Sequence, residues 1–226
     1  MKLLVTAGPT REFLDPVRFL SNRSTGRMGY AVAERAAARG HDVVLVSGPV
    51  SLEPPAGVRI RRIVSALALL TAVQDELPAC DALVMTAAVA DWRPETVSST
   101  KLKKNSATSA TPVTSATAFT IATDGESATL RLVRNPDILA TIRPLKGDRR
   151  FVGFAAETDH VLEEASKKLF RKGLDLVVAN DVTRPGAGFE VDTNIVTFVT
   201  PNAAPIPLPL LSKSDVADKI IDWLEH

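Results

Sequence analysis

A polar loop between the first predicted strand and the first predicted helix carries the residues best suited to bind phosphate. The apolar, partly β-branched run 3–6 predicts a buried strand, which Gly8-Pro9-Thr10 ends. A helix N-terminus beyond such a loop has free backbone N–H groups, to which hydroxyl and guanidinium side chains add donors. The loop up to Gly26 and Gly29 contains many such side chains and one amide: Thr10, Arg11, Arg18, Ser21, Asn22, Arg23, Ser24 and Thr25.

The alternative is an ordinary connection in which a serine or threonine caps the helix. Most strand-to-helix connections have only a few residues. This connection is much longer and carries three arginines, which favours an anion site.

A second group of candidate residues follows a later predicted strand, 81–85. Ligands of open parallel sheets lie beyond the carboxyl ends of the strands, and Ala87 and Ala88 would let a flat group approach the backbone there. Asp91 could hold a magnesium ion bound to a phosphorylated ligand, or it could cap the next element. Lys101-Leu102-Lys103-Lys104 is either a solvated face or a clamp for a triphosphate or a developing oxyanion.

Composition describes an ordinary globular chain. It has 226 residues, 45% hydrophobic and 23% charged, with a net charge of +1, and no long basic tract points to nucleic acid. No run approaches transmembrane length, and the first apolar stretch ends too early for a secretory signal. The one cysteine, Cys80, is expected in the core, and the protein in the cytosol.

Strand and helix patterns alternate along the chain, which predicts an α/β fold with a mostly parallel sheet flanked by helices. We expect one domain, 1–226. The predicted strands are 3–6, 42–47, 58–64, 81–85, 151–156, 174–179 and 195–199. The predicted helices are 26–39, 65–77 with Ser65 as N-cap, 135–143, 159–172 and 212–224 with Ser212 as N-cap.

A hairpin interrupts this alternation. Residues 118–123 and 128–133 are strand candidates around Asp124-Gly125-Glu126, and 105–117 reads as a mobile loop or part of an extended arm. The arm, about 105–133, exposes strand edges and apolar residues such as Phe119, Ile121 and Leu132 that need cover. We therefore expect a two-fold symmetric homodimer in which the arm reaches the other subunit.

Several segments together resemble the phosphopantothenoylcysteine synthetase family. They are TAGPTREFLDPVRFLSNRSTGRMG, LVSGPVSL, AAVADW followed by KLKK, VRNPDIL, GFAAET and KGLDLVVANDV, in family order over nearly the whole chain. The resemblance implies a dimeric ligase with a Rossmann-like fold. It would join 4′-phosphopantothenate and L-cysteine through an acyl-cytidylate, using CTP and Mg²⁺ and releasing CMP and pyrophosphate. It also implies a functional partner, a flavin-dependent decarboxylase that is often fused to the synthetase; this chain looks like a stand-alone synthetase or an excised domain.

The resemblance also implies roles for individual residues. Lys101 matches the catalytic lysine and Asn22 the asparagine that handles the acyl intermediate, with Arg18 four residues before it. Ala87 and Ala88 would border the cytosine, with Phe154 on its other side, and Asp91 would meet the triphosphate through a cation. The remaining implied contacts are to phosphates (Gly8, Thr10, Ser24 and Gly26) and to the nucleotide more generally (Lys172 and Asn180).

Two other classes share the opening pattern. A nicotinamide-dependent dehydrogenase is disfavoured, because no G-x-G-x-x-G follows the first strand and Val46-Ser47-Gly48 offers no acidic residue for a ribose. A non-catalytic nucleotide-sensing module would leave Asp91 and the lysine cluster without a role.

Overall fold

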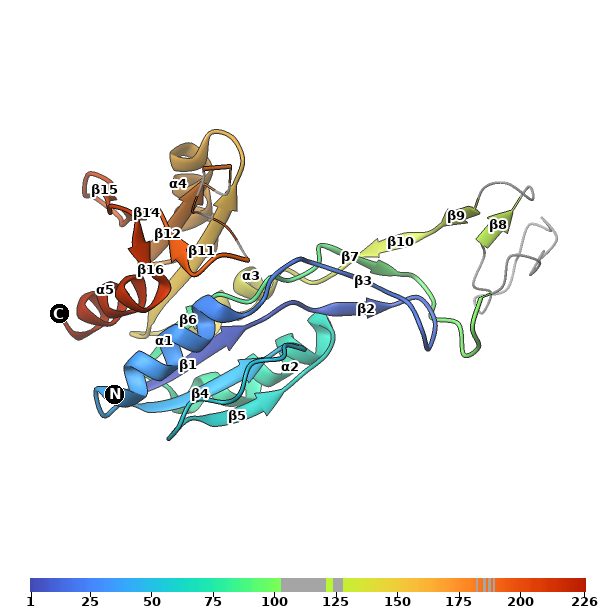
Figure 1. Cartoon of the computed structure of the whole chain (residues 1–226), viewed down its shortest axis with the longest axis horizontal. Helices are drawn as coiled ribbons and strands as arrows, with labels where there is room; N and C mark the ends of the chain where they lie inside the picture. Colours follow the sequence, from blue (N-terminus) through green and yellow to red (C-terminus); the bar gives the residue numbers. More distant parts are fainter. Residues whose placement is uncertain (103–120, 124–127, 182, 185, 187, 189) are drawn as a thin grey trace.

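A mostly parallel eight-stranded sheet forms the centre of the molecule (Figure 1). The structure, a computed structural model, describes residues 1–226 except 103–120, 124–127, 182, 185, 187 and 189. The strand order across the sheet is β15 (Ile206–Pro207), β14 (Val196–Val199), β12 (Leu176–Asp181), β11 (Arg150–Glu157), β6 (Ala82–Met85), β1 (Lys2–Ala7), β4 (Asp42–Ser47) and β5 (Arg59–Arg62). From β5 to β12 the strands are parallel and follow the doubly wound order, whereas β14 pairs antiparallel with β12 and β15 antiparallel with β14. The predicted α/β fold is thus confirmed.

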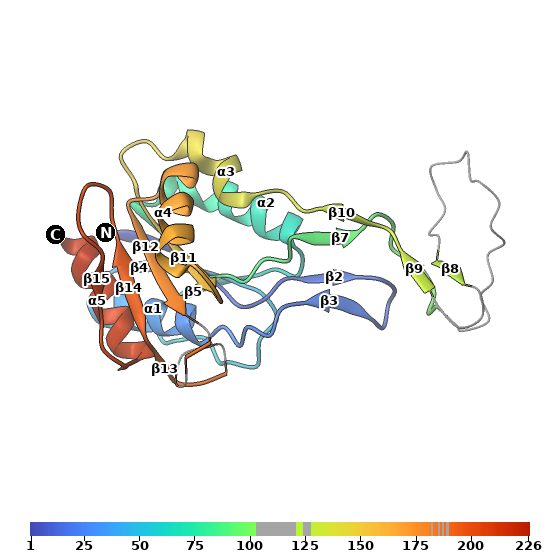
Figure 2. The same ribbon diagram turned by 90° about the horizontal axis from the view of Figure 1, so that it is seen from above.

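Helices cover both faces of the sheet, and alternate strand residues point to different helices. Leu3 and Val5 of β1 share one core with α1 (Arg27–Ala38) and α5 (Lys213–Glu225). Leu4 belongs to the opposite core, with α2 (Ala66–Glu76), α3 (Ile138–Ile142) and α4 (Val161–Lys172). Figure 2 shows the two layers on either side of the sheet. Short 3₁₀ turns, Leu77–Ala79 and Arg143–Leu145, follow α2 and α3.

Local sequence signals set the helix ends. The predicted N-caps are confirmed: the Ser65 hydroxyl accepts from the Ala68 N–H at 3.2 Å, and the Ser212 hydroxyl from the Asp215 N–H at 3.0 Å. Gly40, at φ +82°, terminates α1, because this left-handed conformation lets the His41 N–H reach the Ala36 carbonyl at 3.1 Å. No helix in the described part of the chain is long and apolar enough to span a membrane.

An arm of short strands projects from the sheet in both views (Figures 1 and 2). It is larger than the predicted 105–133 and also contains residues 11–21 and 92–102, whose strands pair in and with it. The polar connection predicted as a loop instead contains an antiparallel hairpin of β2 (Arg11–Phe13) and β3 (Phe19–Ser21). The predicted hairpin at 118–133 forms over β8 (Ile121–Thr123) and β9 (Ala128–Leu130), but β10 (Leu132–Arg134) leaves it to pair with β7 (Trp92–Pro94). The predicted loop 105–117 lies outside the described residues, and the single-domain boundaries stay a prediction.

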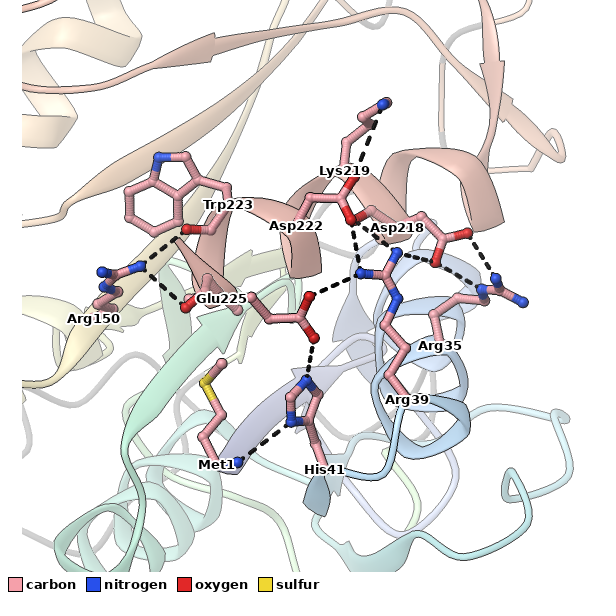
Figure 3. Close-up of polar contacts among 11 residues, drawn as sticks. Met1, Arg35, Arg39, His41, Arg150, Asp218, Lys219, Asp222, Trp223 and Glu225 are labelled. Carbon is pink, nitrogen blue, oxygen red and sulfur yellow. Dashed lines mark hydrogen bonds and ion pairs between the residues drawn. The ribbon is translucent and has the colours of Figure 1, made fainter.

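A network of ion pairs joins α1 to α5 (Figure 3). Arg39 pairs with three carboxylates at once, those of Asp218 (2.9 Å), Asp222 (2.7 Å) and Glu225 (3.2 Å). Arg39 is partly buried, so solvent screens these pairs less than isolated surface pairs. The network therefore fixes the last helix against the first.

We predict that Arg39→Met destabilises the protein by about 1–2 kcal/mol, because three partly buried carboxylates lose their common cation. Urea unfolding would measure this, and the loss should shrink in high salt. Lys219→Met is the matched control, since the long 3.9 Å pair of this exposed lysine with Asp222 should be worth less than about 0.5 kcal/mol. Equal losses for the two variants would contradict a special role for Arg39.

Candidate active site

Two adjoining cavities lie beyond the carboxyl ends of β1, β6, β11 and β12, at the point where the strand order reverses. The α1 cavity has a volume of about 460 Å³ and lies at the N-terminus of α1. The α3–α4 cavity, of about 530 Å³, lies between β6, α3 and α4. Six residues line both: Ala87, Val89, Asp91, Phe154, Glu157 and Lys168.

The loops that follow β1 and β6 are tied together by backbone hydrogen bonds. The Ala88 N–H donates to the Gly8 carbonyl at 2.9 Å, and the Thr10 N–H donates to the Ala88 carbonyl at 3.1 Å. The buried Thr10 hydroxyl accepts from the Ala90 N–H at 3.0 Å. Neither Gly8 nor Thr10 is on the lining of these two cavities; in this structure they shape the floor beneath them.

Glycine is required where these loops meet the start of α1. Gly8 and Gly26 have φ values of +77° and +80°, and a Cβ on either would lie 2.9 Å from a methyl carbon of Val50. Gly26 caps α1 without a side-chain hydrogen bond, and the first turn of α1 has no acidic residue. Together with Ser24, which also lines the α1 cavity, this helix start can receive an anion.

Most of the residues predicted to contact nucleotide or substrate gather at the α1 cavity. Asn22 reaches it from the end of β3 and donates from Nδ2 to the Ala88 carbonyl at 3.0 Å. Further predicted residues on the same lining are Ser24, Gly26, Ala87, Ala88, Asp91, Phe154 and Asn180. They come from segments far apart in the sequence, which the sheet brings to one edge.

Asp91 fits the role of a carboxylate that meets a bound cation. Its side chain is exposed at the junction of the two cavities and has no hydrogen-bond or ion-pair partner among the described residues. The described residues hold no cluster of three or more histidine, cysteine or acidic side chains that could bind a metal alone. A magnesium ion here would therefore need most of its oxygen ligands from a bound triphosphate and water.

Two lysines one helical turn apart on α4 face the α3–α4 cavity. Lys172 pairs with Asp137, and Lys168 donates to the Phe154 carbonyl. Burial lowers the pKa of both ammonium groups. The sequence motifs singled out Lys172 but not Lys168; the spacing of four residues on one helix is the signal that could have found it.

Asn135 is a second lining residue that sequence reasoning did not assign. Its amide donates to the Ala90 carbonyl at 2.8 Å and so braces the loop after β6. The NPD sequence predicted only a helix start, and Asp137 does cap α3. The contact with Ala90 is long-range, so no local pattern indicates it.

Lys101 and Arg18 stand apart from both cavities, whose linings do not include them. Arg18 pairs with Asp15 at 2.6 Å and donates to the Leu102 carbonyl at 2.7 Å, in the turn of the β2–β3 hairpin. The Asp15 carboxylate also accepts from the Leu102 N–H at 3.1 Å. These contacts place the exposed Lys101, beside Leu102, on the arm.

The chain matches a known protein family along its whole length. The family model described as "DNA/pantothenate metabolism flavoprotein C-terminal domain" covers residues 1–226. The chain belongs to this family. Among curated relatives, the "Coenzyme A biosynthesis bifunctional protein CoaBC" of Bacillus subtilis is 45% identical over 220 residues, which are 97% of this chain and 50% of that protein. The Escherichia coli protein of the same name is 42% identical over 223 residues, 98% of this chain and 51% of that protein.

The chain thus spans about half the length of the curated relatives it matches. Among solved structures, the C-terminal domain of a CoaBC protein is 39% identical, with a TM-score of 0.78 over 99% of this chain and 93% of that one. A complex of a Cab2 mutant with phosphopantothenate-cysteine is 18% identical and covers 99% of this chain and 87% of its own; its TM-score of 0.74 shows a shared fold.

The contacts of the Asp15 carboxylate with Arg18 and Leu102 lead us to predict a pH-dependent contribution to the stability of the protein. Burial alone would raise the pKa of Asp15, but hydrogen bonds from Arg18 and from the backbone N–H groups of Leu102, Val17 and Arg18 hold the pKa well below its ordinary value of 3.8. The ionised carboxylate therefore stabilises the fold above pH 3.8, and this contribution is lost as the pH falls through the depressed folded-state pKa.

We expect Asp15→Asn to lower the urea midpoint at pH 7, with a difference from wild type that narrows steadily below pH 3.8. Glu95→Gln, which breaks the exposed pair with Arg131 on the same arm, should have little effect. If the difference in urea midpoint between Asp15→Asn and the wild type stays constant down to about pH 2, the electrostatic explanation is wrong.

Proposed function

We propose that this chain is a phosphopantothenate–cysteine ligase of coenzyme A biosynthesis. The observation that carries the proposal is the gathering of the family-matched residues Asn22, Asp91 and Phe154 on one cavity, in a chain that belongs to this family. The names of the relatives support the pathway. The phosphopantothenate-cysteine bound in the Cab2 complex supports the pair of substrates, 4′-phosphopantothenate and L-cysteine.

CTP is the cosubstrate in this proposal, and the two cavities together offer it space. Its phosphates would lie at the start of α1, near Ser24 and Gly26, where N–H groups and the helix dipole favour negative charge. Its base would lie between the loop carrying Ala87 and Ala88 and the ring of Phe154. Lys168 and Lys172 lie on the neighbouring wall, where their ammonium groups could contact a phosphate.

The reaction has two steps. An oxygen of the 4′-phosphopantothenate carboxylate attacks the α-phosphorus of CTP, the bond to the β-phosphate breaks, and pyrophosphate leaves. The amine of L-cysteine then attacks the acyl carbon of the acyl-cytidylate, loses a proton and expels CMP. Negative charge grows in both steps, and Lys101 would stabilise it in the first, while the Asn22 amide would position the acyl carbonyl in the second. Asp91 would hold Mg²⁺ on the triphosphate, and this ion would supply charge neutralisation.

A homodimer would explain why Lys101 lies outside the cavities of its own chain. Large apolar side chains are exposed along the described part of the arm: Val17, Phe19, Trp92, Val97 and Leu132. A second copy would cover them, because such a patch is unfavourable in water. We propose that the arm of one subunit carries Lys101 and Arg18 into the cavity of the other.

The relatives' "bifunctional" name suggests the next step of the pathway. We propose that the product passes to a phosphopantothenoylcysteine decarboxylase, which would be the functional partner, and that both reactions occur in the cytoplasm. Neither nucleic acid nor a membrane has a role in the proposal.

Incubation with 4′-phosphopantothenate, L-cysteine, Mg²⁺ and CTP should release pyrophosphate and CMP in equal amounts. Chelation of Mg²⁺ should abolish release, and ATP should replace CTP poorly. The product mass, measured by mass spectrometry, identifies the amide. No release with either nucleotide would remove the ligase proposal.

Mixing two inactive variants tests the shared site. Asn22→Asp and Lys101→Gln should each be nearly inactive. After mixing and subunit exchange, activity should recover to about a quarter of wild type, because half of the dimers are mixed and each has one intact site. A monomeric mass by light scattering, or no recovery in a mixture shown by native mass spectrometry to contain mixed dimers, would contradict the arrangement.

A further inference from the structure

Asn194 is a buried polar residue that neither the sequence motifs nor the proposed reaction uses. It lines the α1 cavity, and the residue is 3% exposed. Its Oδ1 has no hydrogen-bond partner among the described residues, and the same is true of Oδ1 of Asn180, on the same lining. Because a buried acceptor without a donor costs free energy, such atoms in native proteins need an explanation.

The backbone holds Asn194 firmly. It belongs to β13 (Thr193–Asn194), which pairs antiparallel with β16 (Leu211–Ser212) at the start of α5. The ammonium of the buried Lys213 donates to the carbonyls of Gly188 and Val191 and anchors the segment before β13. Asn194 Nδ2 lies 3.5 Å from the Met28 sulfur, a weak acceptor. The unpartnered oxygen is therefore built into a fixed wall.

The α1 cavity consequently has two chemically different sides. The start of α1 presents hydrogen-bond donors, which suit phosphate oxygens. The Asn180 and Asn194 oxygens are acceptors, and they require a ligand group that carries N–H or O–H. A fully ionised phosphate offers no such group, so these oxygens face a different part of the ligand.

We propose that Asn194, together with Asn180, forms an acceptor subsite for the ribose hydroxyls of the nucleotide whose phosphates lie at α1. This inference rests on the proposed function. Asn180 pairs with Val196 on β14, two residues beyond Asn194, and with Ala156 on β11, two residues beyond Phe154. A base against the Phe154 ring therefore has its sugar close to this wall. The ammonium group of L-cysteine is the other donor in the reaction, and the test separates the two.

The test compares Asn194→Leu with wild type for binding of CTP, 2′-deoxy-CTP and 3′-deoxy-CTP by calorimetry. CTP affinity should fall roughly tenfold, whereas affinity for the analogue that lacks the contacted hydroxyl should hardly change. Without ligand, the melting temperature should stay the same or rise, because an unsatisfied buried acceptor is removed. Asn194→Asp keeps an acceptor oxygen and should retain the wild-type ratio of CTP to deoxy-CTP affinities.

Three outcomes would overturn the subsite. One is an equal loss of affinity for all three nucleotides together with a lowered melting temperature, which would mean that Asn194 only supports the structure of the cavity wall. Another is unchanged affinity for all three. The third is a raised KM for L-cysteine with unchanged CTP affinity, which assigns the oxygen to the amine. If the wild-type protein binds no CTP, the proposed function fails as well, and that result differs from all three.

Discussion

The hydrogen bonds between the loops after β1 and β6 are the constraint on which both the cavities and the arm depend. The two strands are parallel neighbours at the reversal of strand order, and their pairing continues past the sheet as a bridge between Pro9 and Ala88. Thr10 extends it with its own N–H and its hydroxyl. Without this tie, two long polar loops would have to find their positions separately, at a large cost in conformational entropy. With it, the backbone around Ala88 is fixed beside the start of α1.

The same hydrogen bonds also fix the two points at which the chain enters the arm. These points lie after Thr10, where β2 begins, and after Asp91, where β7 begins, and each strand pairs with a later one. The buried Glu12 of β2 accepts from the Ala66 N–H at the start of α2, which fixes the base of the arm to the domain. Beyond the other end of β2, Asp15 holds the backbone of Leu102. Cavity and arm are therefore parts of one connected frame, although Lys101 lies far along the chain from Asn22.

Strong local patterns predicted the sheet, the long helices and the caps at Ser65 and Ser212, because buried β-branched runs and N-cap side chains act over a few residues. The β2–β3 hairpin was missed, since its strands are three residues long, polar in part and set in a loop that also reads as an anion site. The pairing of β7 with β10 was missed because it joins segments far apart in sequence. Most of the residues that motif resemblance assigned lie on the cavity linings, but the motifs could not distinguish a lining residue from Thr10, whose hydroxyl supports the floor.

Unsatisfied and desolvated polar groups mark the difference between the floor and the walls of the cavities. Below the cavities, the N–H and the hydroxyl of Thr10 both have hydrogen-bond partners. These groups of the floor are therefore satisfied without a ligand. On the walls, burial lowers the pKa of the Lys168 ammonium group. The buried Oδ1 atoms of Asn180 and Asn194 have no hydrogen-bond donor among the described residues. A protein selected only for stability would replace such groups with apolar ones of similar size. In the proposed function, a bound molecule would interact with these groups and would restore in the complex the stability that the free protein loses.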